Sequence, residues 1–136
     1  MLELLAPAGN LDAVIAAVQN GADAVYMGFG DGFNARRSAD NFTQESFAKA
    51  VRYCHIRGCK VYVTLNTLVG DREMDAAAAL AQQASDAGAD AILVQDLGLA
   101  RVLRAALPDI PLHASTQMSI HNLAGVEAAA EMGITR

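Results

Sequence analysis

The chain has 136 residues, of which 53% are hydrophobic and 5% aromatic. This length fits a single domain with a core built mainly from Ala, Val, Leu and Ile side chains. The net charge of −5 argues against a surface that binds nucleic acid by bulk electrostatics, but it leaves open an RNA held by another part of a longer chain. No apolar run reaches the roughly 18 residues of a membrane span, and residues 1–7 do not resemble a signal peptide. These features predict a cytoplasmic protein.

Short apolar runs alternate with segments of helical period along the whole chain. The runs predicted to be strands are Glu3–Leu5, Ala24–Met27, Lys60–Thr64, Ala91–Val94 and Leu112–Ala114. Helices are predicted at about 10–20, 43–57, 72–87, 97–107 and 122–132. Residues 134–136 are predicted to open a sixth strand, and residues 28–42 form the longest loop.

Repeated strand–helix units without a linker predict an α/β fold with one parallel sheet and outer helices. Right-handed crossovers allow either a barrel or an open doubly wound sheet. Polar clusters follow the second, third, fourth and fifth strands, which favours a barrel mouth over the single switch point of an open sheet. We therefore predict a TIM-barrel-like (β/α) repeat that is incomplete, with about five of eight units. Residues 1–136 are expected to be the N-terminal part of a barrel catalytic domain, or a half-barrel that self-associates through exposed sheet edges.

The loop over residues 28–42 carries Arg36 and Arg37, with Asn34 beside them and three glycines before them. Planar guanidinium groups recognise carboxylates and phosphates through two-point hydrogen bonds. Long loops in compact domains are usually functional. We therefore predict that Asn34, Arg36 and Arg37 bind an anionic substrate; the alternative is a solvated loop whose arginines pair with nearby aspartates.

The fifth predicted strand leads into a second polar cluster that contains His113, Ser115 and Gln117. Strand alternation directs His113 and Ser115 to the same side, which can be the barrel interior. We predict that these three residues are catalytic, with the histidine as acid or base and the others as hydroxyl and amide helpers. The alternative is a buried histidine bonded to a neighbouring strand. His and Ser two positions apart on one strand do not by themselves form a nucleophile–base pair.

Further polar residues follow the third and fourth predicted strands. Asn66 and Gln95 are predicted to bind substrate, while Asp96 is expected to cap the next helix. Glu3 is expected to point inward, where a buried carboxylate needs a partner such as an arginine. No metal site is predicted, because Cys54 and Cys59 lack the spacing of a metal-type pair and are expected to be reduced, mostly buried thiols.

Several of these segments, taken together and in order, resemble the N-terminal part of the collagenase-like peptidases, peptidase family U32. The segments are Glu3-Leu4-Leu5-Ala6-Pro7-Ala8-Gly9-Asn10, Gly21-Ala22-Asp23-Ala24-Val25-Tyr26, Phe33-Asn34-Ala35-Arg36, Val61-Tyr62-Val63-Thr64-Leu65-Asn66-Thr67, Val94-Gln95-Asp96-Leu97-Gly98 and Leu112-His113-Ala114-Ser115-Thr116-Gln117. The resemblance covers essentially the whole chain and implies a bacterial, cytoplasmic, barrel-type catalytic domain.

The resemblance implies several activities. Some members are described as proteases, while others act in hydroxylation of tRNA or ribosomal RNA bases with prephenate, or in ubiquinone hydroxylation with an iron–sulfur cluster. The family's cysteine-rich signature lies outside this stretch, so any cluster would be ligated elsewhere and this chain alone is expected to lack a cofactor. Because the arginine loop suits a dicarboxylate such as prephenate, RNA-base hydroxylation is favoured. Proteolysis, quinone-pathway hydroxylation and a non-catalytic assembly module stay open as alternatives.

Overall fold

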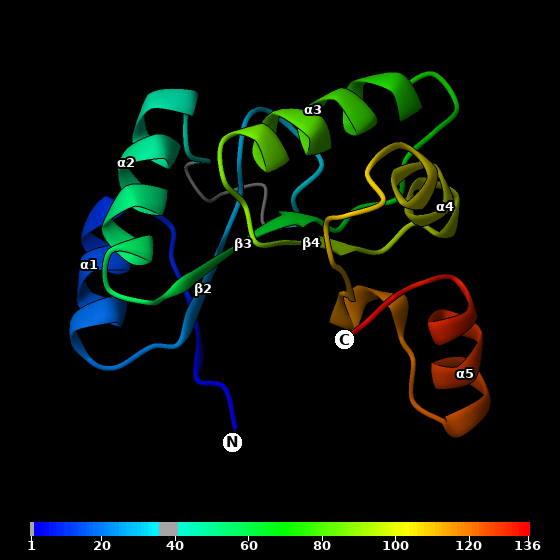
Figure 1. The fold of residues 1–136 in the computed structure, drawn as a ribbon. Coiled ribbons are helices and arrows are strands. Elements are labelled where there is room, and N and C mark those ends of the chain that lie inside the picture. Colours follow the sequence, from blue (N-terminus) through cyan, green and yellow to red (C-terminus); the bar gives the residue numbers. More distant parts are fainter. Residues whose placement is uncertain (1, 36–40) are drawn as a thin grey trace.

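A computed structural model describes residues 2–35 and 41–136 of the chain. Its strands are β1 (Leu5–Pro7), β2 (Ala24–Met27), β3 (Lys60–Leu65), β4 (Ala91–Val94) and β5 (Leu112–Ala114). Its helices are α1 (Leu11–Gln19), α2 (Gln44–His55), α3 (Met74–Asp86), α4 (Leu97–Ala106) and α5 (Leu123–Glu131), with a 3₁₀ turn η1 (Thr116–Met118) after β5. Strands and helices therefore alternate from one end to the other, as the sequence predicts (Figure 1).

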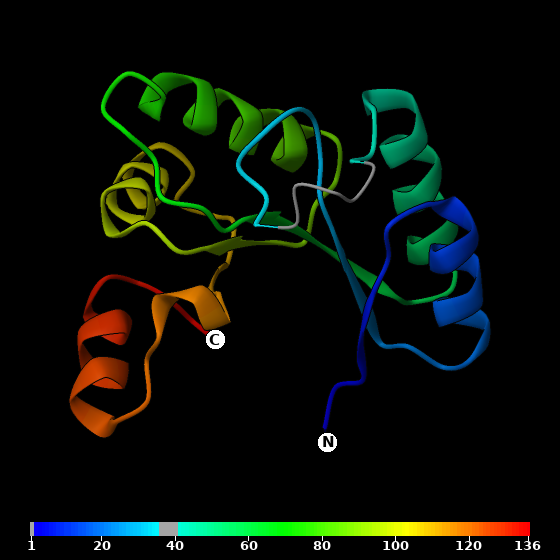
Figure 2. The same cartoon turned by 180° about the vertical axis from the view of Figure 1, so that it is seen from behind.

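The five strands form one parallel sheet in the order β1-β2-β3-β4-β5. A sequential order without reversal, joined by right-handed crossovers, places all helices on one face, as in a (β/α) barrel. Figures 1 and 2 show the helices surrounding the sheet and leaving its other side open. Ile134 forms a parallel bridge to Leu112, so residues 134–136 begin to pair with β5. The predicted fold class and the predicted sixth-strand opening are thus confirmed.

Polar side chains fix where the helices begin. Asn10 accepts a hydrogen bond from the Ala13 amide (2.9 Å) before α1, and Thr43 does the same for Ser46 (3.2 Å) before α2. The carboxylate of Asp96 accepts from the Leu99 amide (2.8 Å) before α4, which confirms its predicted role as a cap. The caps of α1 and α4 begin these helices within a few residues of the preceding strand, whereas α2 begins well beyond the end of β2.

The repeated Gly-Ala-Asp segments before β2 and β4 form the same local structure. In each segment the aspartate makes two hydrogen bonds to one residue of the neighbouring strand region. Its backbone amide donates to the carbonyl of that residue, and its carboxylate accepts from the amide of the same residue. Asp23 pairs in this way with Leu4 (2.9 and 2.7 Å) and Asp90 with Val61 (2.7 and 2.7 Å). Each aspartate thus aligns one strand with its neighbour at the amino-terminal edge of the sheet, far from the carboxyl ends where ligands bind.

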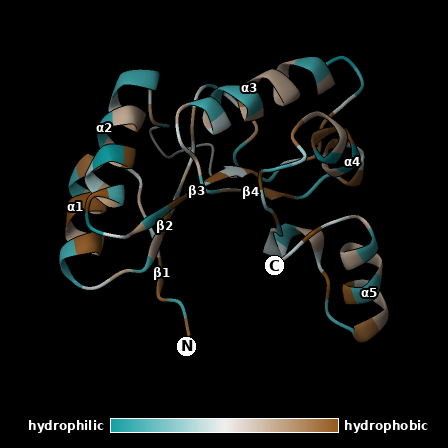
Figure 3. Cartoon of the chain, in the orientation of Figure 1, coloured by the Kyte–Doolittle hydropathy of each residue, from teal (hydrophilic) through white to brown (hydrophobic). Residues whose placement is uncertain are grey.

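The core lies between the sheet and the helices in two apolar clusters. The strands supply most of the larger buried side chains, with Phe47 of α2 and Leu99 and Leu103 of α4 beside them, and the helices also contribute many alanines. On α2 the buried residues are the four predicted ones, Phe47, Ala50, Val51 and Cys54. Figure 3 shows hydrophobic and hydrophilic residues sharing these helices. The face of each helix toward the sheet is therefore apolar and the other is solvated.

Two predicted details are wrong. β1 runs over Leu5–Pro7 and not over Glu3–Leu5, because Leu5 pairs with Ala24 and the preceding residues contact β2 through Asp23 instead. On α4, the helical period predicts a buried stripe of Leu99, Val102, Leu103 and Ala106, but Val102 is 38% exposed and Ala106 is exposed, whereas Ala100 is fully buried with Leu99 and Leu103. The buried stripe of α4 is therefore rotated toward Ala100.

Candidate functional site

A pocket of about 360 Å³ opens on the inner face of the sheet, at the carboxyl ends of the strands. This is the end at which ligands bind in barrel enzymes. The residues that line it come from β1 to β5, from the loops behind them and from the last residue of the chain. They are Leu5, Tyr26, Ala35, Thr64, Asn66, Leu93, His113, Ala114, Ser115, Thr116, Gln117 and Arg136. Four of the predicted site residues, Asn66, His113, Ser115 and Gln117, therefore meet in one place.

His113 supplies the titratable group of the pocket. Its side chain is 9% exposed, and its ring stands edge-on to that of Tyr62, with the centroids 4.8 Å apart and the planes at 82°. Burial lowers the pKa of His113, with the positive charge of Arg136 acting in the same direction. Within residues 2–35 and 41–136, no side chain makes a hydrogen bond to the imidazole. The lowered pKa favours a neutral imidazole, with one donor and one acceptor nitrogen. The alternative interpretation, a histidine hydrogen-bonded to a neighbouring strand, finds no such bond in the described part of the chain.

Asn66 connects two loops across the mouth of the pocket. Its Oδ1 accepts from the Ala35 amide (3.0 Å) and its Nδ2 donates to Ser115 Oγ (3.2 Å). Ser115 Oγ also accepts from the Gln117 amide (3.3 Å), so this hydroxyl begins the turn η1. The Gln117 side chain is exposed at the rim. Ser115 is therefore bound to Asn66 and not to His113, which is not the arrangement of an activated nucleophile.

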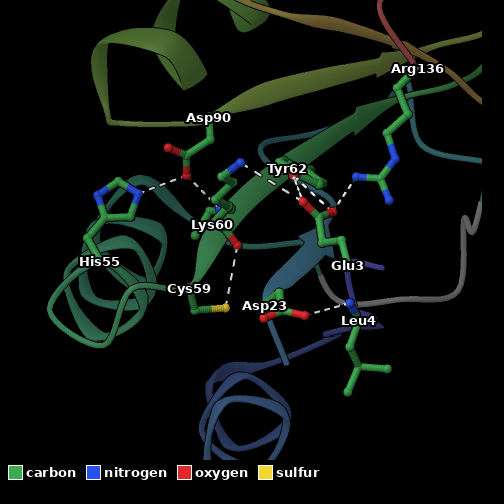
Figure 4. Close-up of polar contacts among 10 residues, drawn as sticks. Glu3, Leu4, Asp23, His55, Cys59, Lys60, Tyr62, Asp90 and Arg136 are labelled. Carbon is green, nitrogen blue, oxygen red and sulfur yellow. Dashed lines mark hydrogen bonds and ion pairs between the residues drawn. The ribbon is translucent and has the colours of Figure 1, made fainter. Parts of the chain in front are cut away.

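An ionic cluster lies on the inner face beside this pocket (Figure 4). Tyr62 donates its hydroxyl to both Glu3 oxygens (2.9 and 3.1 Å), and the Arg136 guanidinium donates to Glu3 and lies 5.8 Å from the Tyr62 ring centre. Lys60 is 4.0 Å from the same carboxylate. Desolvation opposes ionisation of Glu3, but hydrogen bonds from Arg136 and Tyr62 outweigh it and lower its pKa. The predicted inward orientation and arginine partner of Glu3 are confirmed.

Arg136 and Tyr62 are the pocket-associated residues that the sequence analysis missed. Burial, followed by the hydrogen bond to Glu3, raises the pKa of Tyr62 to about 12, so its hydroxyl keeps its proton. The sequence offered one signal for Tyr62: it lies two positions before Thr64 on β3, so both side chains point to the inner face of the sheet. Arg136 lies 133 positions from Glu3 in the chain, and no local pattern connects them.

The remaining predicted residues lie elsewhere. Asn34 lines a second pocket, of about 400 Å³, together with Asp31, Phe33, Asn41, Thr67, Leu68, Glu73 and Gly32. There its Nδ2 donates to the Asn41 side chain (3.1 Å). Gln95 is half-buried behind β4 and does not line the inner pocket. Arg36 and Arg37 lie outside the described residues.

The two cysteines do not fit an iron–sulfur cluster. Both thiols are buried at the amino-terminal end of β3, opposite to the pocket, and burial raises the pKa of Cys54 to about 12. Cluster ligands are thiolates, usually four of them. In the described part of the chain, no group of three or more His, Cys, Asp or Glu side chains is arranged to hold a metal ion. The helices described are all too short or too polar to cross a membrane.

Fold and pocket together define a strand–helix barrel unit with a polar site at its carboxyl-terminal mouth. The sequence pattern of Peptidase family U32 matches residues 9–136, and the chain belongs to this family. It is 40% identical over 135 residues to the 23S rRNA 5-hydroxycytidine C2501 synthase of Escherichia coli K12, covering 99% of this chain and 20% of that protein. It is 39% identical over 134 residues to tRNA hydroxylation protein P1 of Bacillus subtilis 168, covering 98% and 32%.

A collagenase from Porphyromonas gingivalis W83 is 36% identical over 121 residues, which is 88% of this chain and 28% of the collagenase. The chain thus spans between about a fifth and a third of these curated relatives. Among solved structures, a U32 peptidase matches 98% of this chain and 56% of its own, with a TM-score of 0.74 and 16% identity. At that identity the structural match supports the fold alone.

Proposed function

We propose that this chain forms the substrate-binding part of an enzyme that hydroxylates a base in tRNA or ribosomal RNA with prephenate as co-substrate. The relatives of 40% and 39% identity carry RNA-hydroxylation names and align with nearly all of this chain. Because the chain covers only part of each relative, the rest of the machinery, including any iron–sulfur cluster and most of the RNA surface, is assigned to other sequence.

The inner pocket carries this proposal. Its floor is apolar, from Leu5, Tyr26 and Leu93, and its walls are neutral amide, hydroxyl and imidazole groups. A planar base stacks on apolar and aromatic surface and is read through such hydrogen-bonding groups. The Arg136 guanidinium in the lining, and Arg36 and Arg37 from the long loop, supply charge for the carboxylates of prephenate.

Within this site each residue has a defined task. His113 is the proton donor or acceptor, because its neutral ring presents one nitrogen of each kind. Asn66 connects the loop at Ala35 to Ser115 across the mouth of the pocket. Gln117 offers its exposed amide to the ligand. Proteolysis is the second candidate because a relative is named a collagenase. The Ser115 contacts argue against proteolysis, because its hydroxyl accepts a hydrogen bond from Asn66 and has no general base to activate it as a nucleophile in the described part of the chain.

The test uses the intact protein in a strain that lacks its own gene. Nucleosides from tRNA and ribosomal RNA are analysed by mass spectrometry after complementation with wild type, His113→Ala and Gln117→Ala. The matched control is His121→Ala, since that histidine is exposed and, among the residues that the structure describes, is hydrogen-bonded only to the Ser119 carbonyl. We expect the hydroxylated nucleoside to be lost with His113→Ala, reduced with Gln117→Ala and unchanged with the control.

Prephenate binding is measured separately by calorimetry. Replacing both Arg36 and Arg37 by alanine is expected to cost about 1.5–3 kcal/mol of binding free energy, the range of a hydrogen bond to a charged group. Lysine at the responsible position restores binding only in part, because the two-point contact is lost. Unaltered RNA nucleosides in the deletion strain, with cleavage of gelatin by the pure protein, would establish the peptidase instead.

A further inference from the structure

The inner-face cluster connects His113 on β5 to Tyr62 on β3, to Glu3 ahead of β1 and to Arg136 beyond β5. Arg136, which follows the segment paired with β5, bonds to Glu3 ahead of β1, and Glu3 accepts from Tyr62 on β3. Tyr62 in turn contacts the edge-on ring of His113 on β5. Figure 4 shows the Arg136 and Tyr62 side chains converging on Glu3. The contacts therefore form a continuous path from an ion pair to the one imidazole in the pocket.

The contact between Tyr62 and His113 depends on the strand between them. Tyr62 pairs with Ala91 of β4, which is 1% exposed, and Ala24 packs on the other side of the same ring. The small side chains of Ala91 and Ala24 leave room for the Tyr62 ring, which also has Tyr26 of β2 beside it, to reach over β4 toward a residue two strands away. Two hydrogen bonds from its hydroxyl to Glu3 then fix the rotation of the ring. An aromatic ring fixed at both ends restricts the neighbouring imidazole to few orientations.

Charges of both signs face His113: Arg136 and Lys60 lower its pKa, and Glu3 raises it. Arg136 and Lys60 face it from beside β5 and from β3, and Glu3 from ahead of β1; β4 faces it with the apolar Leu93 and Ala91. The Glu3 charge is neutralised by Arg136 and by two hydrogen bonds from Tyr62. Burial and the nearby Arg136 guanidinium together disfavour the protonated, positively charged form of His113.

We propose that Tyr62 and Arg136 are positioning residues for His113: they fix the rotation of its ring and keep it uncharged, so that it meets the ligand as a neutral donor and acceptor. The role in turnover rests on the proposed function, whereas the state of the imidazole can be measured without it. Neither residue is assigned a contact with reacting atoms.

The state of His113 is tested by NMR titration of the intact protein, with its ring signal assigned by comparison with His113→Gln. Arg136→Met removes the guanidinium and leaves Glu3 without its ion pair, so the pKa of His113 should rise. Arg101→Met is the matched control, because it removes the same charge from the exposed outer face of α4. Arg136→Lys retains the positive charge and should leave the titration of His113 close to that of wild type. This variant shows whether an altered titration comes from the lost charge or from a folding defect. Equal titration of His113 in Arg136→Met and Arg101→Met would overturn the proposal.

The orientation of the ring is tested with Tyr62→Phe and Tyr62→Leu in the RNA hydroxylation assay. Phenylalanine keeps the aromatic contact with His113 and loses the bonds to Glu3, whereas leucine loses both. Leucine is expected to lower kcat between about tenfold and a hundredfold with little change in KM, the scale of a misplaced catalytic group. Phenylalanine should fall between leucine and wild type. Equal kcat in all three would remove Tyr62 from this role. If His113 titrates as expected but His113→Gln leaves the RNA unchanged, the positioning stands and the proposed function fails.

Discussion

Asn66 is expected to be the principal bond across the mouth of the pocket, and Asn66→Ala tests this. The substitution deletes two hydrogen bonds, one to the Ala35 amide (3.0 Å) and one to Ser115 Oγ (3.2 Å). Each such bond contributes about 0.5–1.5 kcal/mol net, so the free energy of unfolding should fall by about 1–3 kcal/mol. The side chain is half-buried, so the loss of packing adds little.

Urea denaturation followed by circular dichroism measures this change. Gln82→Ala is the control, because it also removes one amide hydrogen bond, to Asp86 (2.8 Å), but on the exposed face of α3. Surface substitutions of that kind stay within about 0.5 kcal/mol. If Asn66→Ala lowers the free energy of unfolding no more than Gln82→Ala, the two loops are not held together by Asn66, and the pocket wall must be stabilised in another way.

Three further outcomes are expected. Asp90→Ala should cost about 1–3 kcal/mol in urea denaturation, because the Val61 amide (2.7 Å) and the His55 ring (2.8 Å) both lose their acceptor. Burial raises the pKa of Cys54 from 9.0 to about 12, so about a thousandfold less of it is thiolate in the folded chain than in urea. Cys54 should therefore react with iodoacetamide at pH 8 far more slowly in the folded chain, and equal rates would contradict its burial. The lowered pKa of His113 means that the unfolded chain binds its proton first, so stability should fall as pH drops below about 6.5, and His113→Gln should remove that fall.

The local part of the fold was predictable from the sequence, and the long-range part was not. The bounds of β2, β4 and β5 agree with prediction, because apolar runs between glycine turns and capping residues determine them locally. β1 was displaced by two residues, since its position depends on pairing with β2 and on Asp23, which lies 19 residues from Leu4. The Ala100 side of α4 was missed because alanine gives little hydrophobic signal in an alanine-rich chain.

The same distinction applies to the site. Strand-end reasoning brought Asn66, His113, Ser115 and Gln117 together, because parallel strands end at one edge whatever their spacing in the chain. It also placed Asn34 with them, whereas this residue follows a longer stretch after β2 and turns into the neighbouring pocket. The direction of a strand does not determine where the side chain of a loop residue several positions beyond it points. Being close to the strand is not sufficient either, because Gln95, the first residue after β4, does not line the inner pocket.

The unpredicted residues bear on the acid–base role that we propose for His113. A neutral imidazole beside an ionised carboxylate would normally gain a proton more easily, because an opposite charge favours the charged form. Here Glu3 is hydrogen-bonded by Arg136 and Tyr62; its carboxylate still acts to raise the pKa of His113, but burial and the Arg136 guanidinium outweigh it and lower that pKa. Small residues on the neighbouring strands make that arrangement possible, since a larger side chain in place of Ala91 would separate the Tyr62 and His113 rings. The chemistry of the mouth therefore depends on alanines deep on the inner face as much as on the polar residues at the strand ends.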